Sequence, residues 1–292
     1  MSDIFAFTLN GTKIETDGSK SIWELAKDQG TTIPHLCYTD RPSFRADGNC
    51  RACMVEIEGE RVLAPSCMRK PSEGMVVTSQ SARAEKAQKM VMEMLISDQP
   101  ARDASPDPES HFWQMADQTG ITQSRFAPGR DGDFLDDTHP AMNVDLNACI
   151  NCDLCVRACR EVQANDVIGM AARGFDSKIV FDFEDPMGDS TCVACGECVQ
   201  ACPTGALQEK SWLAPSKIDR QVDSVCPFCG VGCQLTYNIA DDKIISVDGR
   251  NGPANEERLC VKGRFGFDYI HNPERLTKPL IQKLYLHTIL CR

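Results

Sequence analysis

The sequence predicts an α+β protein built from several small domains in series, and three observations lead to this expectation. The chain has 292 residues, which is enough for two or three small domains. Only 7% of the residues are aromatic, and this favours several small cores over one large core. Seventeen residues are cysteine, and most of them stand in clusters with C-x2-C spacing. Such spacing is typical of metal sites rather than of disulfide frameworks.

The charge and the apolar pattern argue against several classes of protein. The net charge is −11, whereas nucleic-acid binding needs clustered Lys and Arg. The N-terminus has no basic segment followed by an apolar one, and no apolar run approaches the ~18 residues of a membrane span. We therefore expect a cytoplasmic chain with no nucleic-acid partner and no membrane span. A reducing cytosol keeps thiols available for metals.

The first forty residues predict a β-hairpin, a short helix and a loop. Residues 4–17 contain two alternating strands around Asn10-Gly11, which is a strong hairpin signal. Ser21 is expected to cap the helix, and Glu24 stands where a capping box needs an acidic residue. The chain then becomes irregular, which predicts a long loop.

Further strands are expected after that loop, which covers residues 31–49. Residues 54–58 alternate as a strand does, and residues 61–64 could pair with them. Strands, one helix and a long cysteine-bearing loop together predict a β-grasp domain over residues 1–80.

The clearest predicted helix covers residues 81–97. Five apolar residues fall on one face at helical spacing and are expected to face the core: Ala84, Ala87, Val91, Met94 and Leu95. Residues 99–140 are rich in Pro, Asp, Gly and Ser, which predicts a linker with one short helix around 109–118. We assign residues 81–142 to this helix and linker.

The first cysteine group has the spacing C-x12-C-x2-C-x13-C. Its members are Cys37, Cys50, Cys53 and Cys67. Gly48 precedes the central pair, where the loop is expected to wrap closely around inorganic sulfide. The group resembles the [2Fe–2S] domain of the large electron-transfer subunit of respiratory NADH dehydrogenases and related enzymes. A structural zinc site is the alternative, because four thiolates also suit zinc.

The second and third groups form an internal repeat whose halves begin 43 residues apart. Both halves have the spacing C-x2-C-x2-C-x3-C; their members are Cys149, Cys152, Cys155 and Cys159, then Cys192, Cys195, Cys198 and Cys202. The repeat resembles a bacterial two-cluster ferredoxin, in which the fourth cysteine of each half ligates the other cluster. The resemblance implies two [4Fe–4S] clusters over residues 143–212. Cys202 would complete the first site and Cys159 the second.

The fourth group has the spacing C-x2-C-x3-C-x26-C. Its members are Cys226, Cys229, Cys233 and Cys260. With the text CPFCGVGC and CVKG, it resembles the N-terminal [4Fe–4S] module of molybdenum and tungsten bis-pterin oxidoreductases. This resemblance implies a small β-rich module over residues 219–275. It also implies that Lys262, two residues after the last ligand, links the cluster to a pterin; the alternative is a solvated surface lysine.

All four groups occur in the order found in cytosolic NAD-linked molybdenum formate dehydrogenase alpha subunits, which are related to the large subunit of NADH dehydrogenase. The resemblance extends to about Gln282 and implies one [2Fe–2S] cluster, three [4Fe–4S] clusters and a flavin/NAD-binding partner subunit. It also implies relay of electrons from a molybdopterin site. We expect that site to be absent from this chain and to be supplied by a separate molybdopterin domain.

The sequence departs from this family at two places. Relatives often have a further cluster after the long helix, ligated by one histidine and three cysteines, but the matching residues here are Gln99, Asp103, Pro106 and Phe112. We therefore expect no fifth cluster and regard His111 as an ordinary packing or surface residue. Residues 276–292, with the unassigned Cys291, form an atypical tail. We expect a truncated or split catalytic subunit that does not oxidise formate alone.

Two alternatives stay open. One is a non-catalytic iron–sulfur module that docks on a flavoprotein or molybdenum subunit. The other is a large-subunit fragment of an NADH dehydrogenase-type complex, against which the text around Cys226 and Cys260 argues. An iron hydrogenase is less favoured still, because no cysteines remain for its catalytic cluster.

Overall fold

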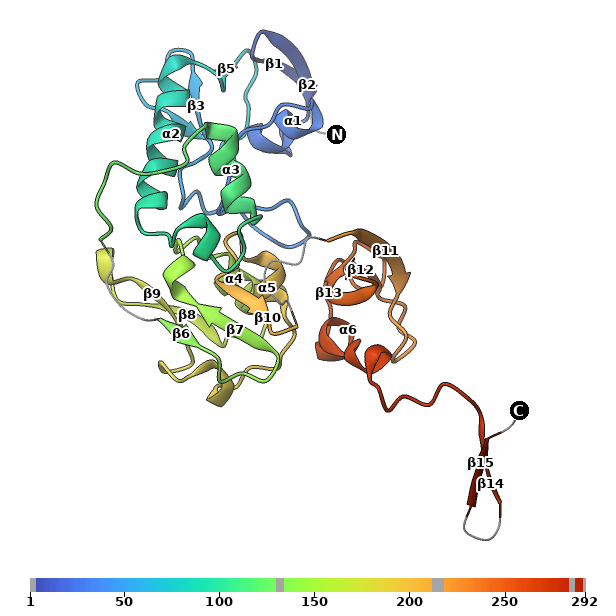
Figure 1. The fold of residues 1–292 in the computed structure, drawn as a ribbon. Helices are drawn as coiled ribbons and strands as arrows, with labels where there is room; N and C mark the ends of the chain where they lie inside the picture. The colour runs from blue at the N-terminus through green and yellow to red at the C-terminus, as the bar shows by residue number, and fades with distance from the viewer. Residues whose placement is uncertain (1–3, 130–133, 212–217, 284–286, 291–292) are drawn as a thin grey trace.

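The computed structural model describes residues 4–129, 134–211, 218–283 and 287–290, and Cys291 lies outside these ranges. Figure 1 shows an N-terminal sheet with its helices, a middle region around α4 and α5, and a small sheet beside it. A terminal hairpin, β14 (Leu280–Lys283) with β15 (His287–Leu290), stands apart from the rest. No helix of the described residues is long and apolar enough to cross a membrane.

The N-terminal region contains a five-stranded mixed sheet in the order β2-β1-β5-β3-β4. Its strands are β1 (Phe5–Leu9), β2 (Thr12–Thr16), β3 (Met54–Ile57), β4 (Ala64–Pro65) and β5 (Val76–Thr78). The predicted hairpin is confirmed: Asn10 and Gly11 connect β1 to β2 with φ of 49° and 82°. The predicted strand at 61–64 is formed only at its last residue, and β5, which runs parallel to β1, was not predicted.

Helix α1 (Ile22–Asp28) begins with the predicted capping box. The Ser21 hydroxyl accepts a hydrogen bond from the Glu24 amide at 3.2 Å, and the Glu24 carboxylate accepts one from the Ser21 amide at 2.7 Å. The buried face of α1 packs into the core between this helix and the sheet, together with Phe7, Val55 and Val77. This core fixes the base of the loop that holds the first cysteine group.

Helix α2 (Ala82–Ser97) forms where expected, but the predicted core face is wrong in part. The buried residues are Ala84, Gln88, Met92 and Ile96, while Met94 is 49% exposed. The polar Gln88 is buried because its amide donates to the carbonyls of Met54 at 2.9 Å and Ser79 at 3.2 Å. A pattern of apolar residues cannot predict that a polar residue is buried, so the predicted core face of α2 is rotated about the helix axis relative to the observed one.

Helix α3 (His111–Thr119) is the short helix predicted in the linker, and it packs on α2. Phe112 is fully buried against Leu36, Ala52 and Met92, while the Gln99 amide donates to the Ala148 carbonyl at 3.2 Å. Gln99 and Phe112 are two of the four residues that stand where relatives have the ligands of a cluster held by one histidine and three cysteines. The absence of a fifth cluster stays a prediction.

The middle region combines two small sheets with short helices. One sheet contains β6 (Leu135–Asp136), β7 (Met142–Asp145) and β10 (Leu207–Glu209); the other pairs β8 (Ile168–Ala171) with β9 (Lys178–Phe181). Helix α4 (Leu154–Arg157) continues as a π-helical turn over Ala158–Val162, and α5 (Glu197–Ala201) is its counterpart in the second half of the repeat.

The C-terminal module is an antiparallel sheet of β11 (Arg220–Val225), β12 (Gln234–Ala240) and β13 (Lys243–Gly249), followed by α6 (Val261–Phe265). Strands β12 and β13 form a hairpin, and Asp241 and Asp242 form its turn with φ of 50° and 58°. Its small core contains Leu235, Val247, Leu259 and Phe267.

Buried charges join the three regions. Glu197 of α5 is fully buried, and its carboxylate pairs with Arg41 of the N-terminal loop and, at 3.8 Å, with Arg264 of α6. Gln200 of α5 exchanges two hydrogen bonds with the backbone of Gly249, at 3.0 and 3.2 Å. Helix α5 is therefore the element on which the other two regions converge.

Replacing Glu197 is expected to destabilise the protein strongly. Glu197→Gln leaves the buried Arg264 and the partly buried Arg41 without their shared anion, and the loss of one partner from a buried pair costs about 3–5 kcal/mol. Glu109→Gln is the control, because Glu109 is exposed and its pair with Arg102, at 3.8 Å, contributes roughly 0–1 kcal/mol. Denaturant unfolding of both variants measures the difference, and equal losses would contradict a central role for Glu197.

The buried carboxyl of Glu209 predicts a pH dependence of stability. Burial raises its pKa to about 8 from an ordinary 4.5, with Arg264 opposing and Asp248 adding to the shift. The folded chain therefore keeps a proton that the unfolded chain releases, and stability falls as pH rises through that window. The stability of Glu209→Gln minus that of the wild type is therefore expected to be larger at about pH 8 than at about pH 5. Exposed Glu184→Gln should show no such difference, and a pH-independent effect of Glu209→Gln would refute the raised pKa.

Candidate iron–sulfur centres

The first cysteine group is assembled by the loop between α1 and β3 together with the turn after β4. Hydrogen bonds link the side chains of Cys37, Cys50, Cys53 and Cys67 into one cluster. Backbone amides also point at the sulfurs: Cys50 N–H donates to Cys37 Sγ at 3.4 Å, and Ala52 N–H to Cys50 Sγ at 3.5 Å. Amide donors of this kind stabilise thiolates and tune the potential of a bound cluster.

The four thiols of the first group strongly shift one another's pKa values. Hydrogen bonds from Cys50 and Cys67 hold the pKa of the Cys37 thiol far below its usual range, and a bond from Cys67 lowers the pKa of Cys53 to about 7. The same contacts raise the pKa of Cys50 and of Cys67. Binding of iron would release the protons that the thiols of this group carry.

The structure gives a reason for glycine at position 48 that differs from the expected one. Its φ is +65°, and a Cβ added there would collide with the Met68 side chain. The close approach that requires glycine is thus between two parts of the protein. The expectation that Gly48 makes room for inorganic sulfide is not needed to explain this residue.

The two halves of the repeat have matching backbone conformations. Asn151 and Ala194 lie in the left-handed region with φ of 51° and 55°, and Asp153 and Gly196 with φ of 68° and 69°. Asn151 N–H donates to Cys149 Sγ, and Ala194 N–H donates to Cys192 Sγ, both at 3.4 Å. The repeated cysteine spacing therefore folds into repeated loops, each of which directs an amide at its first sulfur.

The fourth cysteine of each half lies with the opposite half. Cys202 is an electrostatic neighbour of Cys152 and Cys155, and a small cavity is lined by Cys149, Cys152, Cys155 and Cys202 together. Cys159, in turn, is an electrostatic neighbour of the three cysteines that begin the second half, Cys192, Cys195 and Cys198. This crossing joins the two halves of the repeat at two places.

Burial dominates the chemistry of the innermost thiols in the repeat. It raises the pKa of Cys152, Cys155 and Cys198 well above the ordinary value for a thiol, and neighbouring cysteines raise it further. Such thiols bind metal only when the metal displaces their protons. An amide N–H from Val167 donates to Cys159 Sγ at 3.4 Å and would stabilise the thiolate form.

The fourth group lies at the surface of the C-terminal module. Cys226 and Cys233 are half-buried and joined by a backbone hydrogen bond of 2.8 Å, whereas Cys229 and Cys260 are exposed. All three other members act electrostatically on Cys233, whose pKa is raised by burial first and then by these neighbours. Three apolar side chains beside the group are exposed: Phe228, Val231 and Val261. Lys262 is exposed as well, and its expected contact with a pterin stays a prediction.

The described cysteines fit iron–sulfur clusters by their donor chemistry. Each of the four sets offers four thiol groups on loops that direct amide N–H groups or further cysteines toward the sulfurs, as cluster ligation requires. Within the described ranges, no group of three or more His, Cys, Asp or Glu side chains has the arrangement that would hold one metal ion.

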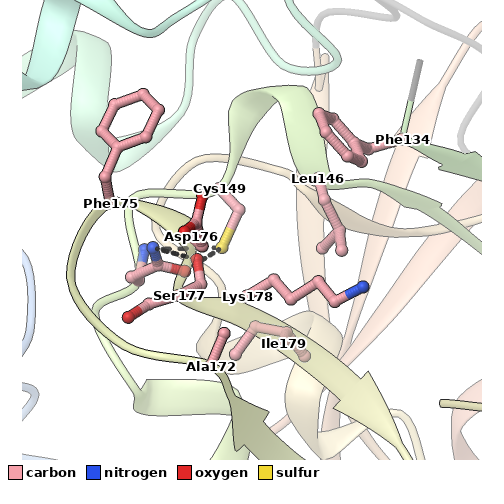
Figure 2. A pocket seen from close by; sticks show the side chains of 10 residues that line it. Phe134, Leu146, Cys149, Ala172, Phe175, Asp176, Ser177, Lys178 and Ile179 are labelled. Atoms are coloured by element: carbon pink, nitrogen blue, oxygen red, sulfur yellow. Dashed lines mark hydrogen bonds between the residues drawn. The ribbon is translucent and has the colours of Figure 1, made fainter. Parts of the chain in front are cut away.

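A cavity of about 390 Å³ opens beside the second group. Figure 2 shows Cys149 among its lining, with Phe134 and Phe175 on either side and Lys178 and Ile179 below. The amide of Asn151 closes one wall by donating to the Ser177 carbonyl at 3.0 Å. Cys149 is therefore the most accessible point of the second group.

Sequence reasoning missed several buried polar residues around these centres. Arg157 and Glu197 lie inside the cysteine motifs, and Arg264 follows the fourth group. The sequence marks these residues only by their charge within or just after a cysteine motif, where the short loops leave little exposed surface. His111 packs as expected: its ring lies 4.5 Å from that of His35, and its Nε2 is 2.8 Å from the His35 carbonyl oxygen.

Three family models match consecutive parts of the chain. Residues 3–82 match the 2Fe-2S iron-sulfur cluster binding domain, residues 142–206 the 4Fe-4S dicluster domain, and residues 219–272 the molybdopterin oxidoreductase Fe4S4 domain. Each matched range contains one of the cysteine sets described above or, in the dicluster domain, both halves of the repeat. The cofactor classes expected from the sequence, 2Fe-2S and 4Fe-4S, are thereby confirmed.

Curated relatives match almost the whole chain. An NADH-quinone oxidoreductase G subunit of Rhizobium meliloti is 32% identical over 94% of this chain, and a putative formate dehydrogenase of Staphylococcus haemolyticus is 24% identical over 97% of it. In both comparisons the chain spans 33% of the relative's own length. These relatives are therefore about three times as long as the region they share with it.

A solved structure has the same arrangement over most of the chain. The crystal structure of an NAD+-reducing [NiFe]-hydrogenase in the H2-reduced state matches with a TM-score of 0.66 and 28% sequence identity, over 74% of this chain and 92% of that chain. Taken with the cysteine geometry and the curated relatives, this match identifies an iron–sulfur electron-transfer chain. It is homologous to the N-terminal iron–sulfur region of NADH-quinone oxidoreductase G subunits, NAD-linked hydrogenase subunits and formate dehydrogenase-type subunits.

Proposed function

We propose that this chain holds one [2Fe–2S] and three [4Fe–4S] clusters and relays electrons between a molybdopterin site, supplied by another domain or chain, and a flavin/NAD-binding partner. The main support is the crossing of Cys159 and Cys202 between the halves of the repeat. Disulfide or single-metal proteins have no need for this crossing, whereas paired cubanes depend on it.

The ligand sets that we propose are those expected from the sequence, and the crossing supports the two in the repeat. We assign Cys37, Cys50, Cys53 and Cys67 to the [2Fe–2S] cluster; Cys149, Cys152, Cys155 and Cys202 to one [4Fe–4S] cluster; Cys192, Cys195, Cys198 and Cys159 to the second; and Cys226, Cys229, Cys233 and Cys260 to the third. Bound clusters supply one-electron redox chemistry.

The residues of the chain hold, insulate and align these centres. One apolar cluster contains Cys37 of the first group and Cys152 of the second, together with Phe44 and Leu154, and so joins these two groups. Helix α6 packs closely on the third group, because a Cβ at Gly196 would lie 2.7 Å from Arg264 Cγ. Packed protein therefore connects each cysteine group to the next, from the first to the fourth.

Two physiological roles fit this relay. The match of residues 219–272 to the molybdopterin oxidoreductase Fe4S4 domain favours a formate dehydrogenase-type enzyme, in which Lys262 would lie between cluster and pterin. The 32% identity to an NADH-quinone oxidoreductase G subunit favours a complex of that class. Assay of the purified complex for formate-dependent NAD reduction would separate them, because only the first role predicts it.

Anaerobic purification and reconstitution tests the cluster count. We expect about fourteen iron atoms per chain and an equal amount of acid-labile sulfide. A value near ten would remove one cubane from the assignment. Stoichiometric zinc with little iron would contradict the proposed function.

Single cysteine substitutions test the crossing. Cys159→Ser is expected to lose the same electron paramagnetic resonance signal as Cys195→Ser, because both would ligate one cluster. Cys202→Ser should instead match Cys152→Ser. If Cys159→Ser matched Cys152→Ser, each half of the repeat would hold its own cluster and the crossing would be wrong.

A further inference from the structure

Arg157 has an unusual position for a positive charge. It ends α4 between two cysteines of the second group and is only 1% exposed. Its guanidinium donates to the carbonyl of Cys37 at 2.7 Å and to the carbonyl of Cys152 at 3.1 Å. One side chain thus binds the backbone of a cysteine from the first group and a cysteine from the second.

The remaining donors of Arg157 are also used. Nη1 donates to the Arg45 carbonyl at 2.5 Å, and Nε lies 3.3 Å from the Asp153 carbonyl and 3.0 Å from the Asp47 carboxylate. Asp47 is itself 10% exposed, so the ion pair is largely removed from water. A buried charge is tolerated only when it is paired and fully hydrogen-bonded, and Arg157 meets both conditions.

The location of Arg157 coincides with the contact between two cysteine groups. Cys37 and Cys152 belong to one apolar cluster with Leu154 and Ala158, which flank Arg157 in the sequence. Charges interact strongly across such an interior because few water molecules screen them. A cation there acts on both groups at once.

We propose that Arg157 is the positioning residue that fixes the first and second centres relative to each other and favours the reduced state of both. This inference rests on the proposed function, because it requires clusters in both groups. Reduction adds one negative charge to a cluster, and a nearby buried cation stabilises that charge. The hydrogen bonds to the Cys37 and Cys152 carbonyls keep the two ligand loops at a constant separation.

The test is a redox titration of both centres, monitored by electron paramagnetic resonance, in the anaerobically purified chain. Arg157→Gln removes the charge, so the potentials of both centres are expected to shift in the negative direction. Arg160→Gln is the matched control: it removes the same charge three residues away, but Arg160 is 54% exposed and paired with Asp166 at the surface. A negative shift no larger than that of Arg160→Gln would overturn the proposal.

A second variant separates charge from fold. Asp47→Asn leaves the Arg157 guanidinium without its counter-charge, so both potentials should shift in the positive direction. A purely structural role would move the two variants the same way. The opposite signs therefore support the electrostatic role, and equal signs refute it. Asp47→Asn keeps the test decisive if Arg157→Gln fails to fold.

Arg157→Lys tests the positioning role. Lysine keeps the charge, but its single ammonium cannot replace all three guanidinium nitrogens, which bond the Cys37 and Cys152 carbonyls through Nη2, the Arg45 carbonyl through Nη1 and the Asp153 carbonyl through Nε. The potentials are expected to return toward wild type, while the magnetic interaction between the two reduced centres weakens. An unchanged interaction would remove positioning from the role of Arg157. Wild-type iron content and cluster signals are measured alongside, and their absence would refute the proposed function rather than this inference.

Discussion

The crossed approach of Cys159 and Cys202 to the opposite halves of the repeat is the constraint on which the rest of the structure depends. Each half folds a short loop with left-handed residues and an amide aimed at its first sulfur. In the ligation that we propose, neither half completes a four-sulfur set alone. With the fourth ligand of each proposed set coming from the other half, cluster binding would require both loops to be folded together; α4 and α5 do lie in contact.

The flanking regions join this centre through buried charges. Glu197 brings Arg41 and Arg264 to α5, while Arg157 reaches from α4 to the carbonyl of Cys37. Aromatic residues are few, and charge pairs take part of the role that large apolar side chains play in bigger cores. The result is a chain of cysteine groups in direct protein contact, which suits transfer of single electrons.

Local signals in the sequence predicted local structure well. The Asn10-Gly11 hairpin and the Ser21 cap formed because few residues determine each of them. Strand β5 was missed because its parallel partner β1 lies more than sixty residues earlier. The α2 face was misplaced because Gln88 is buried by two carbonyl contacts that no periodicity contains. The spacing of the cysteines predicted the cysteine groups. The roles of Arg157 and Glu197 follow no sequence pattern, because they depend on contacts between regions that are distant in the sequence.

The most direct measurement is the Mössbauer spectrum of the anaerobically reconstituted, 57Fe-labelled chain. The account predicts two cluster types, with binuclear iron contributing roughly one seventh of the absorption and cubane iron the remainder. A spectrum of isolated tetrathiolate iron, or of one cluster type only, would contradict it.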